Sequence, residues 1–73
     1  MNIGKIITDR RKALGLTQQS LAEKLNISFQ AVSKWENGTS YPDVTILPGL
    51  AATLKVSIDS LLGHSLQSLT EYE

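Results

Sequence analysis

Two short helical segments separated by only three residues constrain the fold of this chain more than any other feature. Residues 18–25 carry an apolar stripe with helical spacing, and residues 29–36 carry Val32 and Trp35 on one face. Residues 26–28 supply an asparagine suited to a left-handed backbone, an apolar isoleucine and a serine that can cap the second helix. Because this joint holds no flexible linker, we expect the helices to cross steeply and the second to face outward.

This geometry has two interpretations on spacing alone. One is a helix-turn-helix at about residues 17–36, which presents its second helix to a partner; the other is a helical corner that only builds core. The side chains that the second helix turns outward must decide between them.

Further helical signals flank this pair. The apolar spacing of residues 2–14 predicts a first helix that ends at Gly15, and Ser57 can cap a short fifth helix at residues 58–62. No window alternates apolar and polar residues as a half-buried strand requires. The predicted class is therefore all-α, with five helices packed into one compact domain.

The fourth helix contains a conflict between its cap and a proline. Asp43 can cap a helix that runs to about Leu54, but Pro48 lacks the N–H that a residue beyond the first turn donates. We therefore expect either a distorted first turn or a helix that begins afresh near Ile46.

The length of the chain, 73 residues, leaves room for one domain, which we expect to span residues 1–63. Residues 64–73 are polar and short, and we assign them to a C-terminal tail or the start of a linker. The sequence has no apolar run long enough to cross a membrane and no secretory signal. We therefore expect a cytoplasmic protein without a membrane partner.

Residues for catalysis or metal binding are scarce. His64 is the single histidine, and with no cysteine in the chain it cannot build a zinc site alone. No Ser/His/Asp arrangement, paired carboxylates or glycine-rich phosphate loop is found. We expect no enzyme activity, no metal and no cofactor, and no small-molecule ligand is evident from the sequence.

The formal net charge of zero would ordinarily argue against a nucleic-acid partner, because domains that bind phosphates are usually basic. The average hides a division of the chain. Residues 1–38 hold six basic and three acidic side chains, a formal +3, whereas residues 39–73 hold one basic and four acidic side chains, a formal −3. A nucleic-acid partner therefore stays open.

Base-reading side chains project from residues 29–36 on the face opposite the apolar one: Phe29, Gln30, Ser33 and Lys34. Glutamine can pair with adenine, lysine can donate to guanine, serine can bond to base edges, and phenylalanine can contact the thymine methyl group. The alternative is an ordinary solvated helix face. Phe29 weighs against it, because an exposed aromatic ring without a partner leaves apolar surface in water.

Phosphate contacts are expected at two places. One is the start of the helix at residues 18–25, near Thr17 and Gln18, where amides and the helix N-terminus favour an anion. The other is the backbone beyond Asn37 and Gly38. Gln18 is the strongest candidate, since its side-chain amide can also donate; an ordinary helix-start glutamine is the alternative.

Arg11 and Glu36 form a candidate structural pair. Arg11 belongs to the first helix and Glu36 to the end of the third, next to the apolar Trp35. A bidentate ion pair would join the two helices. The alternative is two independent surface charges.

Matching residues recur, in order, along about residues 3–63. They are the stretches 11–18, 21–28, 31–38 and 41–43, followed by Leu50, Ala51, Leu54, Val56, Ser57, Leu61 and Leu62. At these positions the chain resembles the lambda-repressor-like helix-turn-helix family of bacterial and phage regulators, also called the XRE or Cro-type family.

The resemblance implies a five-helix domain that binds DNA, usually as a dimer on a partly palindromic operator. It implies that the third helix lies in the major groove, that the positions of the four base-reading side chains face bases, and that those of Gln18, Ser28, Asn37 and Gly38 face phosphates. The family's arginine and glutamate at the Arg11 and Glu36 positions commonly pair.

Two positions depart from the family's pattern. Asn26 stands where the family usually has glycine, and asparagine tolerates the same backbone. Thr39 replaces a common basic residue, so one phosphate contact lacks its usual donor.

Two functions remain open from the sequence. The favoured one is a sequence-specific transcriptional regulator of double-stranded DNA, expected to repress by occupancy. The rival is a protein-interaction adaptor or antitoxin-like module, which the zero net charge favours. A homodimer is expected from leucines near the end of the chain, namely Leu61, Leu62, Leu66 and Leu69.

Overall fold

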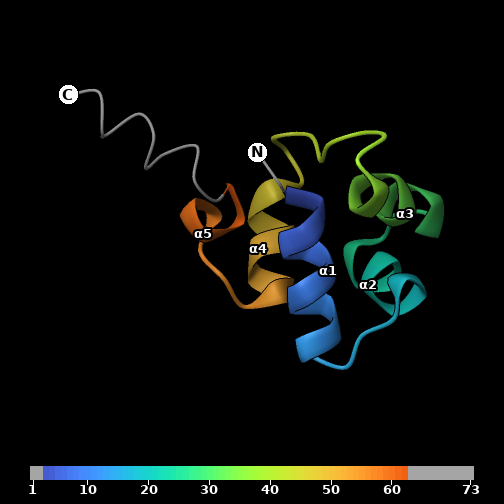
Figure 1. The fold of residues 1–73 in the computed structure, drawn as a ribbon, viewed down its shortest axis with the longest axis horizontal. Coiled ribbons are helices and arrows are strands. Elements are labelled where there is room, and N and C mark those ends of the chain that lie inside the picture. Colours follow the sequence, from blue (N-terminus) through green and yellow to red (C-terminus); the bar gives the residue numbers. More distant parts are fainter. Residues whose placement is uncertain (1–2, 63–73) are drawn as a thin grey trace.

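The computed structural model describes residues 3–62 of the chain, which form an all-α fold without strands. Five helices follow one another along the described residues: α1 (Ile3–Ala13), α2 (Gln18–Leu25), α3 (Phe29–Asn37), α4 (Leu47–Leu54) and α5 (Ile58–Leu62). Figure 1 shows α1 in the middle, with α2 and α3 on its right and α4 and α5 on its left. The predicted five-helix class is confirmed. The assignment of residues 64–73 to a tail, with His64, Leu66 and Leu69, lies outside the described residues.

Local caps explain where the central helices begin and end. The Thr17 hydroxyl accepts from the backbone N–H of Ser20 at 3.0 Å, and the Ser20 hydroxyl in turn accepts from the Thr17 N–H at 2.9 Å. Asn26 ends α2 with φ 59°, and its N–H donates to carbonyls of the last turn. Ser28 caps α3 by accepting from the N–H of Ala31 at 3.3 Å. Asparagine at position 26 therefore performs the role usually given to glycine.

The start of α4 decides between the two sequence expectations. The helix begins at Leu47, with Ile46 as a cap residue that makes no side-chain bond and Pro48 in the first turn, where its missing N–H costs nothing. The Asp43 carboxylate instead accepts from the N–H of Thr45 at 3.0 Å, which closes a local turn. The expected cap role of Asp43 on α4 was wrong, and the fresh start near Ile46 is confirmed.

The core lies where all five helices meet. Its buried side chains include the predicted inner positions of the central pair and members of every helix: Ile3, Ile7, Leu21, Ala22, Val32, Trp35, Leu50, Ala51, Leu54 and Leu61. The sequence suggested Leu61 as part of a dimer interface. Leu61 is instead fully buried within the single chain, so it is not available for that contact. Among residues 3–62, no helix combines the length and apolar character needed to cross a membrane.

Two close approaches fix α1 against its neighbours. A Cβ atom added to Gly4 would lie 2.5 Å from the Trp35 carbonyl oxygen, so α1 and α3 touch through their backbones. On the other side, the Arg10 guanidinium donates to the Leu54 carbonyl at 3.0 and 3.1 Å and satisfies the C-terminal end of α4. Neither approach was predicted from the sequence.

Candidate nucleic-acid interface

The α2–α3 unit is rigid because its inner face is buried. Leu21 and Ala22 of α2 pack with Val32 and Trp35 of α3, and each of these side chains is at most 6% exposed. With its inner face held in this way, α3 turns its opposite face away from the core. Figure 1 shows α3 at the outer right edge of the molecule.

The four predicted base-reading side chains share this outer face. Phe29, Gln30 and Lys34 are exposed and Ser33 is half-buried. No side-chain hydrogen bond or ion pair holds Gln30, Ser33 or Lys34 to any other residue among residues 3–62. Phe29 keeps 42% of its surface exposed. The arrangement therefore leaves three polar side chains and one ring free to meet a partner.

Gln18 has a partner inside the domain that the sequence did not indicate. Its side-chain amide donates to Glu36 Oε1 at 3.1 Å and so ties the start of α2 to the end of α3. A glutamine amide has two N–H groups, so one donor remains. In the first turn of α2 the Ser20 N–H is capped by Thr17, whereas the Gln18 and Gln19 N–H groups have no carbonyl partner within the helix.

The remaining expected phosphate contacts are partly engaged in closing the helices. Thr17 and Ser28 use their hydroxyl groups as caps. The Gly38 N–H donates to carbonyls of the last turn of α3, with Gly38 itself at φ 81°. The Asn37 side-chain oxygen accepts from the Thr39 N–H at 3.0 Å and from the Thr39 hydroxyl. The Asn37 amide group therefore still has both N–H donors, whereas the Gly38 amide is already used.

The predicted pair of Arg11 and Glu36 is present and nearly buried. The Arg11 guanidinium donates to the two Glu36 oxygens at 2.7 and 3.0 Å, and a third N–H donates to the Leu16 carbonyl at 2.9 Å. The side chains are 12% and 7% exposed. Because its oxygens also meet Gln18, Glu36 joins α1, α2 and α3.

Hydrogen bonds to the pair determine its protonation. Burial alone would raise the pKa of Glu36, but bonds from Arg11, Gln18 and Thr8, with the positive charge of Arg11, together lower it below its ordinary value. The bond to Glu36 raises the pKa of Arg11. Both groups are therefore charged at neutral pH, and the pair cancels the positive charge that Arg11 would otherwise offer to a phosphate.

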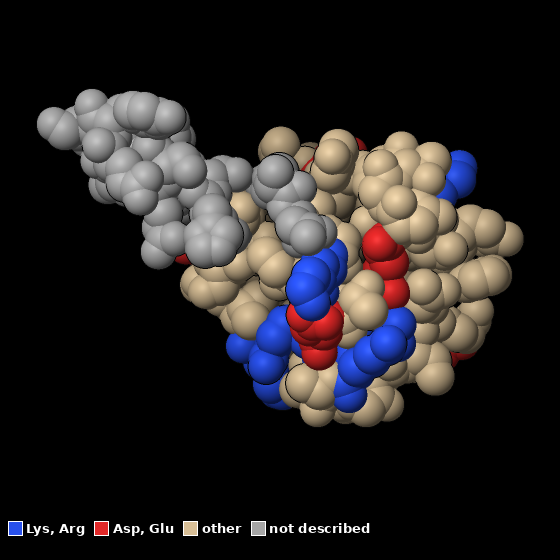
Figure 2. Space-filling view, viewed as in Figure 1, with Lys and Arg blue, Asp and Glu red and all other residues tan. Residues whose placement is uncertain are grey.

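The basic side chains do not gather on the outer face of α3. Lys34 is the only lysine or arginine of α3, and Arg11 is neutralised by Glu36. Figure 2 shows most of the basic surface toward the lower part of the molecule, whereas the side that carries α3 is mainly uncharged. The charge division read from the sequence thus does not become a broad basic face around α3.

Comparison with known proteins adds independent information. The model of the helix-turn-helix family matches residues 7–61. An HTH-type transcriptional activator of Enterococcus faecalis, BcrR, is 39% identical over 100% of this chain and 36% of its own length. The transcriptional repressor RstR of the cryptic phage CTXphi in Vibrio cholerae is 35% identical over 88% of this chain and 57% of its own length.

Solved structures agree with the family match. The P22 c2 repressor, in complex with a synthetic operator, superimposes with a TM-score of 0.79 at 33% identity, covering 84% of this chain and 92% of that one. The two curated relatives are longer, and this chain spans 36% and 57% of their lengths.

Proposed function

This chain belongs to the helix-turn-helix family, with the lambda-repressor-like fold, and from this premise we propose that it binds double-stranded DNA sequence-specifically and regulates transcription. One observation carries the proposal. The outer face of α3 holds Gln30, Ser33 and Lys34 without partners in residues 3–62, on a helix whose inner face is locked into the core. Unpaired polar side chains on a rigid helix suit the major groove, which admits an α-helix.

In the proposed complex, each outer side chain of α3 has a role. Gln30 pairs with an adenine edge and Lys34 donates to guanine, while Ser33 bonds to a neighbouring base. Phe29 lies against a thymine methyl group, and this contact removes its exposed ring from water.

Phosphate contacts then set the register of α3 in the groove. Gln18 contributes its second amide N–H together with the N-terminus of α2, and Asn37 contributes its side-chain amide at the other end of the motif. Thr17, Ser28 and Gly38 cap the helices and so hold these donors in place. Their backbone also faces the DNA phosphates in the proposed complex.

We further propose that two chains bind together on a partly palindromic operator. Two α3 helices in successive major grooves lie about 34–36 Å apart, one turn of DNA. Within residues 3–62, Ile58 and Leu62 on α5 offer apolar surface for pairing, since Ile58 is 38% exposed and Leu62 is partly buried. We propose that the bound dimer represses transcription by occupying the operator. We also propose a cytoplasmic location and no catalytic activity.

The test is a comparison of specific and random duplexes at fixed salt. A site is first selected from a random duplex pool with the 73-residue chain. Gln30→Ala and Lys34→Ala are expected to lose about tenfold in affinity for this site with little change on random DNA, because each removes a base contact of about 1–3 kcal/mol. Gln18→Ala is expected to weaken both complexes equally.

Two outcomes would count against the proposal. Equal losses on both duplexes for all three variants would remove the base-reading role of α3. An affinity for duplex DNA that is absent, or flat with salt concentration, would favour the adaptor or antitoxin-like module, since phosphate contacts release counterions and make binding salt-dependent.

A further inference from the structure

A pocket lies at the end of the domain where α1 passes into α2 and where α2 and α4 end. Its volume is about 490 Å³, and its lining residues are Leu14, Leu16, Lys24, Ala52, Thr53 and Lys55. These residues come from three separate parts of the sequence. The volume falls within the range of about 300–1,000 Å³ that is typical of small-ligand sites.

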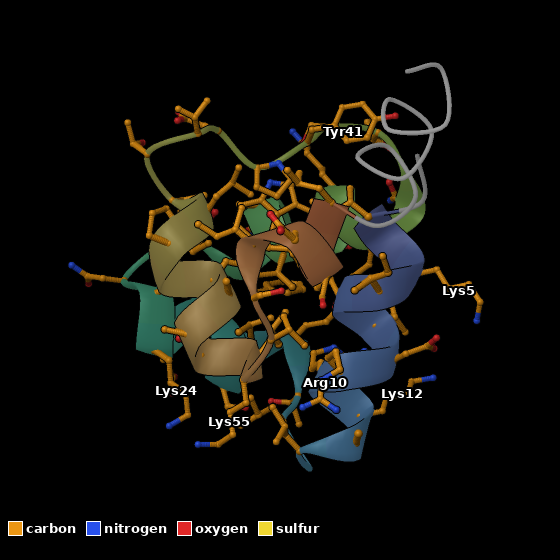
Figure 3. The ribbon with its side chains drawn as sticks, turned by 90° about the vertical axis from the view of Figure 1, so that its left-hand side faces the viewer. Lys5, Arg10, Lys12, Lys24, Tyr41 and Lys55 are labelled. Atoms are coloured by element: carbon orange, nitrogen blue, oxygen red, sulfur yellow. The ribbon has the colours of Figure 1, made fainter. Side chains whose placement is uncertain are left out.

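Two lysines without acidic partners border this pocket. Figure 3 shows Lys24 and Lys55 side by side at the lower end of the molecule, in a view of the side away from α3. Neither side chain makes a hydrogen bond or ion pair in the part of the chain that the structure describes, and no carboxylate lines the pocket. By contrast, Lys5 lies 3.0 Å from Asp9, and Arg11 lies 2.7 Å from Glu36.

Further basic side chains lie at the lower end of the molecule. Figure 3 places Arg10 and Lys12 at the same end of the molecule. The Arg10 guanidinium is directed at the Leu54 carbonyl, next to Lys55 in the chain, and contacts no carboxylate. Like charges at one end repel each other, so a bound anion between them would be stabilised.

The rest of the lining is suited to an apolar chain. Leu14 and Leu16 are partly buried and pack against the core, so each keeps a remaining apolar surface toward the pocket. The Thr53 hydroxyl has no hydrogen-bond partner within residues 3–62 and adds a donor. The pocket therefore joins a cationic rim to an apolar floor.

A simpler explanation is that both lysines only complement the negative ends of helices. Lys24 lies in the last turn of α2, and Lys55 follows the end of α4. For Lys55 this explanation is weak, because Arg10 already satisfies the last carbonyl of α4. Lys55 also has φ 59°, a left-handed conformation that glycine or asparagine adopts more easily.

We propose that this pocket binds a small organic carboxylate, with the carboxylate group between the Lys24 and Lys55 ammonium groups and the apolar chain on Leu14 and Leu16. A bare inorganic anion would leave the apolar floor in water, and an alcohol would leave the two ammonium groups unpaired. The site does not rest on the proposed function, since none of its residues belongs to the outer face of α3.

The test uses hexanoate as the probe, titrated into the ¹⁵N-labelled 73-residue chain and followed by amide chemical shifts. The expected result is saturable binding with a dissociation constant on the order of 1 mM, as suits a ligand of so few atoms. The shift changes should centre on residues 14–16, 24 and 52–55. Hexanol and inorganic phosphate, titrated in parallel, are each expected to bind at least tenfold more weakly.

Two variants separate binding from folding. Lys55→Gly removes an ammonium group at a position where glycine is the preferred residue, so the melting temperature should hold or rise while hexanoate affinity falls about tenfold or more. Lys24→Met keeps a good helix former in α2 and should lose affinity similarly. Lys12→Gln is the matched control, since Lys12 lies at the same end but does not line the pocket.

The proposal is overturned if hexanoate causes no saturable shifts, if hexanol or phosphate binds as tightly as hexanoate, or if Lys55→Gly binds hexanoate like the parent chain. Loss of affinity in Lys12→Gln equal to that in the pocket variants would also overturn it, because the effect would then be general charge attraction. Each readout is independent of DNA binding.

Discussion

The two sides of α3 use polar residues in opposite ways. On the inner side, Glu36 accepts from Arg11 and Gln18 at distances of 2.7 to 3.1 Å. On the outer side, Gln30 and Lys34 make no side-chain bond among residues 3–62. Buried polar groups stabilise a fold only when all are paired, whereas exposed unpaired groups cost little and remain free for a ligand. One short helix thus carries bonded polar groups on its inner face and unbonded polar groups on its outer face.

The largest effect should come from breaking the inner cluster. Arg11→Ala leaves the Glu36 carboxylate nearly buried without its main partner, and we expect a loss of about 3 kcal/mol in the free energy of unfolding. Urea unfolding measures it. Lys5→Ala is the control, because the Lys5–Asp9 pair is more than 60% exposed on both side chains and should contribute less than about 0.5 kcal/mol. Similar losses of stability in both variants would contradict the distinction between a nearly buried ion pair and an exposed one.

A second test addresses the backbone contact on the same inner side. Gly4→Ala places a Cβ atom 2.5 Å from the Trp35 carbonyl, so α1 must move away from α3, at a cost of about 2 kcal/mol. Gly49→Ala is the matched control in α4, where the added Cβ would meet only the Leu25 side chain at 3.8 Å. There we expect a gain of up to about 1 kcal/mol from helix propensity. If both alanines prove equally tolerated, the close packing of α1 on α3 is refuted.

Substitutions on the outer side of α3 should weaken DNA binding and leave the stability of the fold nearly unchanged. Gln30→Ala and Lys34→Ala are expected to change the free energy of unfolding by less than about 0.5 kcal/mol, as surface changes usually do. The same variants should lose about 1–2 kcal/mol of binding energy on a selected DNA site. Melting curves and DNA titrations on the same samples provide the comparison. A large loss of stability in either variant would mean that the outer face also supports the fold.

The smallest expected effect is the pH dependence of the inner cluster. The folded state lowers the pKa of Glu36, so its contribution to stability is present above the ordinary glutamate pKa and is lost as pH falls through the folded value. The unfolding free energy should therefore decrease below about pH 4.5. Glu36→Gln should be less stable at pH 7, because it lacks the charged carboxylate. It should also have a flatter acid limb, that is, a smaller decrease in stability with falling pH, because a neutral glutamine does not titrate. An unchanged acid limb in this variant would exclude Glu36 as a source of the dependence.

Asp43 contributes to the acid limb in the same direction. Its bonds from the Thr45 backbone and hydroxyl lower its pKa, but the group is fully exposed. Asp43→Asn therefore serves as the control for the Glu36 experiment, with a smaller change expected in the acid limb.

Where local chemistry settled the structure, the sequence predicted it well. The joint between α2 and α3 follows from Asn26 and Ser28. One pair of distant residues was also expected, namely Arg11 with Glu36, and it is present at 2.7 Å. Asp43 was misassigned, because its carboxylate satisfies Thr45 two residues on and cannot also cap a helix that begins at Leu47. Ile46, which packs against the core, occupies the position that precedes the helix instead.

By itself the sequence determined the helix class, the caps of α2 and α3 and the division of α3 into inner and outer faces, because each depends on residues within about one helical turn. Apart from the Arg11–Glu36 pair, only the tertiary structure decided which distant groups meet. Gly4 lies under Trp35, Arg10 reaches Leu54, and Lys24 comes beside Lys55 across one pocket. The physical reason is that packing of the apolar faces sets the positions of whole helices. Contacts between residues more than 25 positions apart then follow from that packing and from no local pattern.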